Sequence, residues 1–276
     1  MLLSLRLEAH SGFQWTNSYS RTLHARCSDA VARAGLTDVH DNETSPPWTA
    51  SEIYPYRRDV SLGETNWIVF ASPEQSVLKA IADEFERKPR FNAGPMQYDI
   101  RAARPLPVDV GAVGESGTLV TTSGLVLKIG ERDGTATYWS RGNKDARDRA
   151  WKTFKTHLRR SVGGVCRQHD LVEPADTAPV FDEYEFLKDF CVDVQFATGW
   201  RQPVPMSLWR LHYKIRDELH RQQLELLTAT GLGARTGYGF GCVLPAPHDE
   251  ATKYDTLDQY AIGVSNDDKR TTPADA

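Results

Sequence analysis

The sequence predicts an α+β fold that contains two similar units in tandem, followed by a short tail. Three features of the 276-residue chain lead to this prediction. Nearly the same order of strand-like and helix-like segments occurs twice, and a stretch rich in proline and glycine at 105–117 separates the two copies. A glycine-rich turn near the C-terminus closes the second copy.

The first unit is predicted to span residues 1–105. Leucines at 3, 5 and 7 alternate with polar residues, which is the pattern of a half-buried strand. From 20 to 34, apolar residues recur at three- and four-residue steps, and Gly35 follows as a helix C-cap. The predicted elements are, in order, a strand at 3–9, a helix at 20–34, strands at 48–54 and 66–71, a helix at 74–88 and a strand at 96–103. This is the order of a ferredoxin-like, or RRM-like, unit.

The second unit is predicted to span residues 118–245 and to repeat this order with one additional strand. Its predicted elements are a hairpin of 118–129 with 135–140, a helix at 145–162, strands at 185–198 and 205–213, a helix at 217–228 and a strand at 240–244. Residues 246–276 are acidic and are predicted to form a flexible tail that adds nothing to the core.

The composition is that of a soluble globular protein, with 40% hydrophobic and 25% charged residues. No apolar stretch is long enough for a membrane helix, and the N-terminus lacks the features of a secretory signal. The four cysteines lie far apart without a C-x-x-C pair, so the spacing favours neither a zinc site nor disulfides. We therefore expect a cytoplasmic protein that binds no cofactor and does not contact a membrane.

Charge is distributed unevenly along the chain. Residues 246–276 hold seven acids and three bases, which accounts for the whole net charge of -4. By contrast, residues 141–167 hold nine Lys and Arg against two Asp. A basic helix is one way to bind phosphates, and the alternative is a solvated helix without a ligand. The candidate phosphate-binding residues of this segment are Lys144, Arg147, Lys155 and Arg159.

The segment 231–241 carries five glycines in eleven residues. Glycine at this density lets backbone N–H groups converge on an anion. A dinucleotide-binding turn does not fit, because Thr236 replaces the third glycine of G-x-G-x-x-G and the segment follows a helix instead of a strand. A P-loop does not fit either, since no Gly-Lys-Ser/Thr follows. A tight helix-to-strand turn without a ligand remains possible.

The glycine spacing carries a family resemblance. Gly231-Leu-Gly233, five residues and Gly239-Phe-Gly241, set after a helix near the C-terminus, resemble the signature loop of the repeat-associated (RAMP) superfamily of CRISPR RNA-binding proteins. Within it, the chain is similar to the endoribonucleases that cut CRISPR precursor RNA inside its repeats. The resemblance implies two ferredoxin-like units, and precursor and guide RNA as partners together with other subunits of an interference complex. It also implies an RNA-binding loop, which here comprises Gly231, Gly233, Arg235, Gly237, Gly239 and Gly241.

The same resemblance implies the catalytic residues. Family members place a histidine in the loop after the first helix, before a proline-aromatic segment, and His40 matches this position. Tyr19 matches a tyrosine that assists proton transfer, and His24 inside the helix is the alternative histidine. Some relatives carry a lysine soon after the histidine. It is missing here, and Arg57 and Arg58 are the nearest cations.

Cleavage of RNA without a metal requires a base, an acid and positive charge around an attacked phosphate. The pairs His40-Asp41 and His169-Asp170 lack the further ligands of a metal site. Together with the resemblance, this predicts 2'-hydroxyl attack that leaves a 2',3'-cyclic phosphate and a 5'-hydroxyl. Two alternatives remain: a non-catalytic RNA-binding subunit of a CRISPR complex, and an enzyme that binds a nucleotide or phosphate ligand at the glycine turn.

Overall fold

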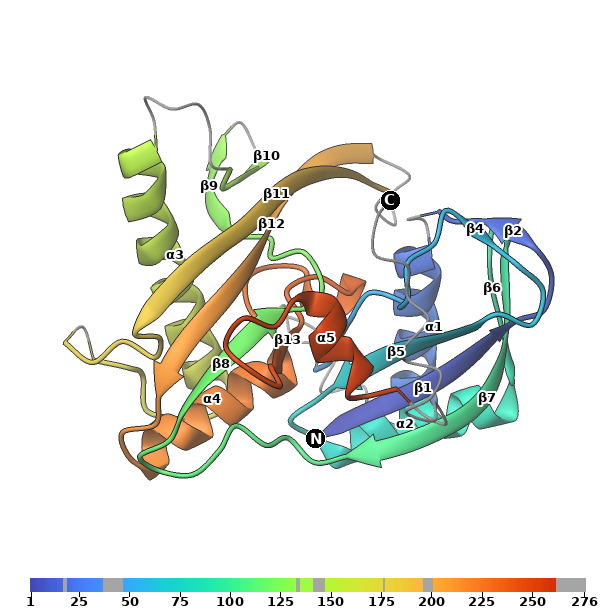
Figure 1. Ribbon diagram of the computed structural model, residues 1–276, viewed down its shortest axis with the longest axis horizontal. Helices are drawn as coiled ribbons and strands as arrows, with labels where there is room; N and C mark the ends of the chain where they lie inside the picture. The colour runs from blue at the N-terminus through green and yellow to red at the C-terminus, as the bar shows by residue number, and fades with distance from the viewer. Residues whose placement is uncertain are drawn as a thin grey trace.

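The computed structural model describes residues 1–16, 19–36, 47–132, 135–140, 147–175, 177–195 and 201–261. Two sheet-containing units lie side by side, the N-terminal unit (residues 1–106) and the C-terminal unit (residues 116–245), with the last described helix between them (Figure 1). The structure combines helices and sheets, as the predicted α+β class requires. No helix in the described ranges is long and apolar enough to cross a membrane.

The N-terminal unit is an antiparallel sheet covered on one face by two helices (Figure 1). The strands lie in the order β3 (Thr49–Ala50), β5 (Thr65–Ala71), β1 (Leu2–Ala9), β7 (Met96–Leu106), β6 (Arg90–Ala93), the helices are α1 (Tyr19–Arg33) and α2 (Gln75–Arg87), and β2 (Phe13–Gln14) pairs separately with β4 (Asp59–Val60). The alternating leucines of β1 lie in one core with the apolar stripes of both helices. Gly35, just after α1, has a φ of +73°, which agrees with the predicted helix end.

The C-terminal unit has a second antiparallel sheet with two helices. The strands lie in the order β11 (Glu183–Gln195), β12 (Arg201–Lys214), β8 (Ser116–Thr121), β13 (Val243–Pro245), and the helices are α3 (Arg147–Gln168) and α4 (Glu218–Thr230). Its core centres on stacked aromatic rings, with Phe154 and Trp209 3.9 Å apart at their centroids.

The predicted hairpin of 118–129 with 135–140 is wrong in its first half. β8 ends at Thr121, and only β9 (Lys128–Arg132) pairs with β10 (Thr135–Tyr138), in a small sheet of its own. The intervening residues are held elsewhere, because the Thr122 amide donates to the Cys242 carbonyl and Leu125 exchanges backbone hydrogen bonds with Ser207. Long-range partners therefore break what the sequence pattern presents as one strand.

The prediction that the acidic segment adds nothing to the core is also wrong for residues 246–261. A short helix, α5 (Lys253–Asp258), begins with a capping box between Thr252 and Asp255. Leu257 is buried against residues of both units, and the Ser4 hydroxyl donates to the Tyr260 carbonyl at 2.7 Å. The segment thus packs across both units, while residues 262–276 lie outside the described part of the chain.

Leu257→Ala is expected to lower the free energy of unfolding by about 2–4 kcal/mol, because it empties a buried leucine site between the units. Leu62→Ala is the matched control, since Leu62 is 73% exposed and its loss is expected to cost less than about 0.5 kcal/mol. Urea denaturation of both variants measures the difference. Equal stabilities would show that α5 contributes nothing to the fold.

Candidate functional site

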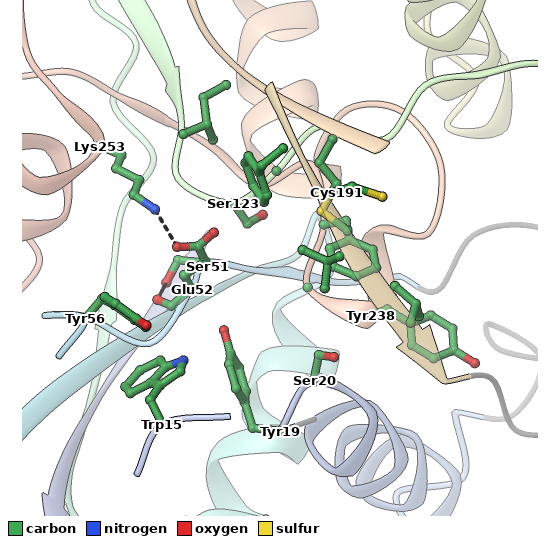
Figure 2. Close-up of a pocket in the computed structure, with 18 of the residues that line it drawn as sticks. Trp15, Tyr19, Ser20, Ser51, Glu52, Tyr56, Ser123, Cys191, Tyr238 and Lys253 are labelled. Carbon is green, nitrogen blue, oxygen red and sulfur yellow. Dashed lines mark hydrogen bonds and ion pairs between the residues drawn. The ribbon is translucent and has the colours of Figure 1, made fainter. Parts of the chain in front are cut away.

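A cavity of about 950 Å³ opens between the two units (Figure 2). The N-terminal unit contributes the start of α1 and the segments around Trp15 and Glu52, and the C-terminal unit contributes β11, β12 and the glycine-rich turn. α5 completes the lining with Lys253 and Tyr254. The cavity therefore forms only when both units and the C-terminal segment are in place.

Tyr19, one of the predicted catalytic residues, lies at the wall of this cavity. Figure 2 shows its hydroxyl pointing into the cavity, toward Ser51 and Glu52. The hydroxyl accepts a long hydrogen bond from the Ile53 amide at 3.4 Å. Burial, with a further contribution from the Glu52 carboxylate, raises the pKa of Tyr19 above its ordinary value, so the phenol keeps its proton near neutral pH. Tyr19 is placed to donate a hydrogen bond or a proton into the cavity.

An ion pair crosses the cavity from the N-terminal unit to the C-terminal segment. Lys253 Nζ lies 2.5 Å from Glu52 Oε2, and the two side chains are 16% and 30% exposed. Glu52 comes just after β3, whereas Lys253 lies 201 positions further along the chain. Neither residue stands out in the sequence, because no local pattern marks a single glutamate after a short strand, or a single lysine in an acidic segment, as part of a site.

The glycine-rich turn connects α4 to β13 and packs tightly against the C-terminal unit. A Cβ on Gly233 would lie 2.3 Å from the Val126 carbonyl oxygen, and one on Gly241 would lie 1.9 Å from that of Leu232. Both positions have positive φ, +86° and +67°. Side chains are therefore excluded here by the close approach of neighbouring backbone.

The backbone amides of the turn are mostly used inside the fold. The donors and their acceptors are Gly231 to Leu227 O, Gly233 to Ser161 Oγ, Gly239 to Thr236 O and Gly241 to Gly124 O. These four amides already have acceptors and are not free to converge on an anion, contrary to the sequence-based expectation. The close packing of the turn therefore explains the glycines. Arg235 has a left-handed φ of 65° and its Nε donates to the Tyr138 hydroxyl at 3.3 Å. An RNA contact by this turn stays a prediction.

His24, the alternative catalytic histidine, joins α1 to the glycine-rich turn. Its Nδ1 lies 2.8 Å from the Gly237 carbonyl oxygen, which requires the proton on Nδ1. The imidazole stacks on Tyr238 with centroids 4.3 Å apart and planes 14° apart, and it also contacts Trp48. His24 does not line the cavity. The arrangement favours a role in holding the turn against α1.

Other predicted site residues lie apart from the cavity or outside the described residues. His40 and Lys144 belong to the undescribed part of the chain. Arg57 pairs with Glu64 at 2.9 Å and, like Arg58, is not in the cavity lining.

The basic helix also lies apart from the cavity. α3 begins at Arg147, covers the outer side of the C-terminal unit (Figure 1) and contributes no residue to the lining. Lys155 lies over the Trp151 ring, with 4.8 Å between Nζ and the ring centroid, and Arg159 is exposed. Any RNA contact of α3 therefore concerns a surface separate from the cavity. Among the described residues, no group of three His, Cys, Asp or Glu is arranged to hold a metal ion.

The sequence is similar to that of a known protein over most of its length. No protein-family model matches it. The chain is 29% identical over 259 residues to the CRISPR-associated endoribonuclease Cas6 of Haloferax mediterranei, covering 87% of this chain and 92% of the relative.

Solved structures share its fold. A Cas6-related protein from Pyrococcus furiosus matches with a TM-score of 0.67 and 16% identity, over 90% of this chain and 99% of that one. A structure described as a RAMP protein binding different RNA substrates matches with a TM-score of 0.66 and 17% identity, over 89% and 99%. At these identities the likeness concerns the fold alone. With the sequence relationship over most of the chain, the predicted resemblance to CRISPR-associated endoribonucleases is confirmed.

Proposed function

We propose that this protein is an endoribonuclease that cleaves CRISPR precursor RNA within its repeats. The observation that carries the proposal is the sequence relationship to a CRISPR-associated endoribonuclease over 87% of the chain. The cavity between the units supports it, because it brings a protonated tyrosine and an ion pair together in a site open to a large ligand.

The reaction that we propose needs no metal. The 2'-hydroxyl attacks the adjacent phosphorus while a base removes its proton, and an acid protonates the departing 5'-oxygen. The products carry a 2',3'-cyclic phosphate and a 5'-hydroxyl. His40 is the proposed proton-transfer residue, because an imidazole exchanges protons near neutral pH. Tyr19 donates a hydrogen bond to a phosphate oxygen or to the leaving oxygen.

RNA is proposed to reach the cavity along two ferredoxin-like units. Arg235 of the glycine-rich turn, with Lys155 and Arg159 of α3, is proposed to contact phosphates outside the cavity. Lys144 and Arg147 are proposed to contact phosphates as well. Such contacts position the RNA without reading its sequence. The product guide RNA then stays with the protein or passes to other subunits of an interference complex.

Incubation of the purified protein with its own repeat RNA in EDTA tests the function directly. We expect one major cut that persists in the chelator and yields a 5'-hydroxyl, detected as a fragment that polynucleotide kinase labels without prior phosphatase treatment. RNA with a single 2'-deoxy nucleotide at the cut is the control and is expected to stay intact, because it lacks the attacking hydroxyl. Cleavage of that RNA, or cleavage only with added metal, would contradict the mechanism. Tight binding without any cut would support the non-catalytic subunit instead.

A further inference from the structure

The cavity has an aromatic wall that the proposed cleavage chemistry does not use. Trp15 and Tyr56 lie there edge to face, with centroids 5.1 Å apart, and Trp15 also contacts Tyr19 at 5.9 Å (Figure 2). Tyr56 is 53% exposed, whereas most large hydrophobic side chains of the described residues are buried or half-buried. An aromatic pair left open at the rim of a cavity offers a flat apolar face to a ligand.

A charged pair stands directly beside this wall. Figure 2 shows Glu52 between the aromatic rings and Lys253. Lys253 bonds to Glu52 Oε2, and among the described residues none donates a hydrogen bond to Oε1. One carboxylate oxygen and part of the ammonium group therefore remain available to a ligand in the cavity.

We propose that this corner of the cavity binds one unpaired guanine of the RNA substrate, which rests on the proposed function because it assigns part of the same site. The base stacks on Trp15 and Tyr56, as unpaired bases do on aromatic side chains in RNA-binding proteins. The Glu52 carboxylate accepts hydrogen bonds from the guanine N1–H and N2 amine, and the Lys253 ammonium donates to O6.

Guanine matches this pair better than the other bases. It presents two neighbouring N–H donor positions followed by an acceptor, which is complementary to a carboxylate beside an ammonium. Adenine, cytosine and uracil each place an acceptor next to a single donor position, so one carboxylate oxygen would face another acceptor. A buried or half-buried carboxylate oxygen without a donor is unfavourable. The pair therefore selects guanine, while the aromatic wall supplies affinity.

The test measures binding and is independent of cleavage. The probe is repeat RNA with a 2'-deoxy nucleotide at the cut, and Kd is measured by fluorescence anisotropy in EDTA. Each unpaired nucleotide is replaced in turn by an abasic one. We expect a single guanine whose removal weakens binding to the wild type by about 5- to 150-fold, the range for one stacked base. In Trp15→Ala or Tyr56→Ala, the same abasic replacement is expected to weaken binding little further. In Trp15→Phe, it is expected to weaken binding almost as much as in the wild type.

Inosine at that position tests the reading of the base edge, because inosine lacks only the N2 amine. Inosine is expected to weaken binding to the wild type and to have almost no further effect on Glu52→Gln. The control is Asp83→Asn, which alters the exposed Lys79–Asp83 pair on α2, outside the cavity, and is expected to behave as wild type. Coupling here means that the change in the RNA and the substitution in the protein have non-additive effects on Kd. Coupling at a different base would overturn the assignment of guanine, and no coupling at any position would overturn the site.

The outcomes separate this proposal from the proposed function. A protein that shows the coupling but does not cut intact repeat RNA keeps the base site and loses the nuclease. A protein that cuts without the coupling keeps the nuclease and loses the base site. No binding to repeat RNA would overturn both.

Discussion

His40→Ala is expected to slow cleavage of repeat RNA by about 10²- to 10⁴-fold while changing the Kd for uncleavable RNA by less than about threefold. The loss reflects the removal of one positioned proton-transfer group from a reaction that moves two protons. The measurement is the single-turnover rate with protein in excess over RNA, which separates the chemical step from product release.

Two other histidines are the controls for this variant. His24 donates to the Gly237 carbonyl and stacks on Tyr238, and it is not itself in the cavity lining. His24→Ala is therefore expected to weaken the contact of α1 with the glycine-rich turn. Any decrease in the cleavage rate of His24→Ala should therefore be explained by the lower stability of the variant. His169 lies in the turn directly after α3 and is not in the cavity lining, and His169→Ala is expected to cleave at the wild-type rate.

The pH profile adds a second readout. When a histidine acts as base or acid, the cleavage rate changes with pH between about pH 5 and 8, and this dependence should vanish in His40→Ala. Tyr19 does not make the rate depend on pH in this range, because burial keeps its pKa high. If His24→Ala abolished cleavage in a fully folded protein while His40→Ala did not, the proton transfer would belong to His24.

Gly241→Ala is expected to lower the free energy of unfolding by about 3 kcal/mol or more. Two costs combine at this position. A left-handed backbone costs an alanine about 1–2 kcal/mol, and forcing a methyl group into packed surroundings costs about 1–3 kcal/mol. The new Cβ would lie 1.9 Å from the Leu232 carbonyl oxygen, so the backbone of the turn must move.

Gly35→Ala separates the two costs. Gly35 has a similar φ, +73°, but a Cβ added there would have no other atom within 4 Å. This control is expected to cost about 1–2 kcal/mol, the backbone penalty alone. Urea denaturation of both variants gives the difference, provided that the m-value, the slope of the free energy of unfolding against urea concentration, is unchanged. Equal losses would show that the turn tolerates a side chain and that its glycines serve backbone conformation only.

The local patterns of the sequence predicted most of the elements. β1, α1, α2 and α4 lie within a few residues of their predicted positions, because each has a strong periodicity or an end signal of its own. Patterns failed where long-range partners decide the structure. Residues 122–127 look like a continuation of β8, yet the Thr122 amide donates to the Cys242 carbonyl and the Leu125 amide to the Ser207 carbonyl.

The candidate site shows the same division. The sequence by itself determined the class of fold, the order of the longer helices and strands, the glycine-rich turn and the place of Tyr19 at the start of a helix, since these depend on near neighbours in the chain. Only the tertiary structure decided that the turn's amides are occupied, that His24 lies against Tyr238 and that Lys253 meets Glu52 across 201 positions. Contacts of that kind depend on how two units and a short helix pack together, and no local pattern records which surfaces will meet.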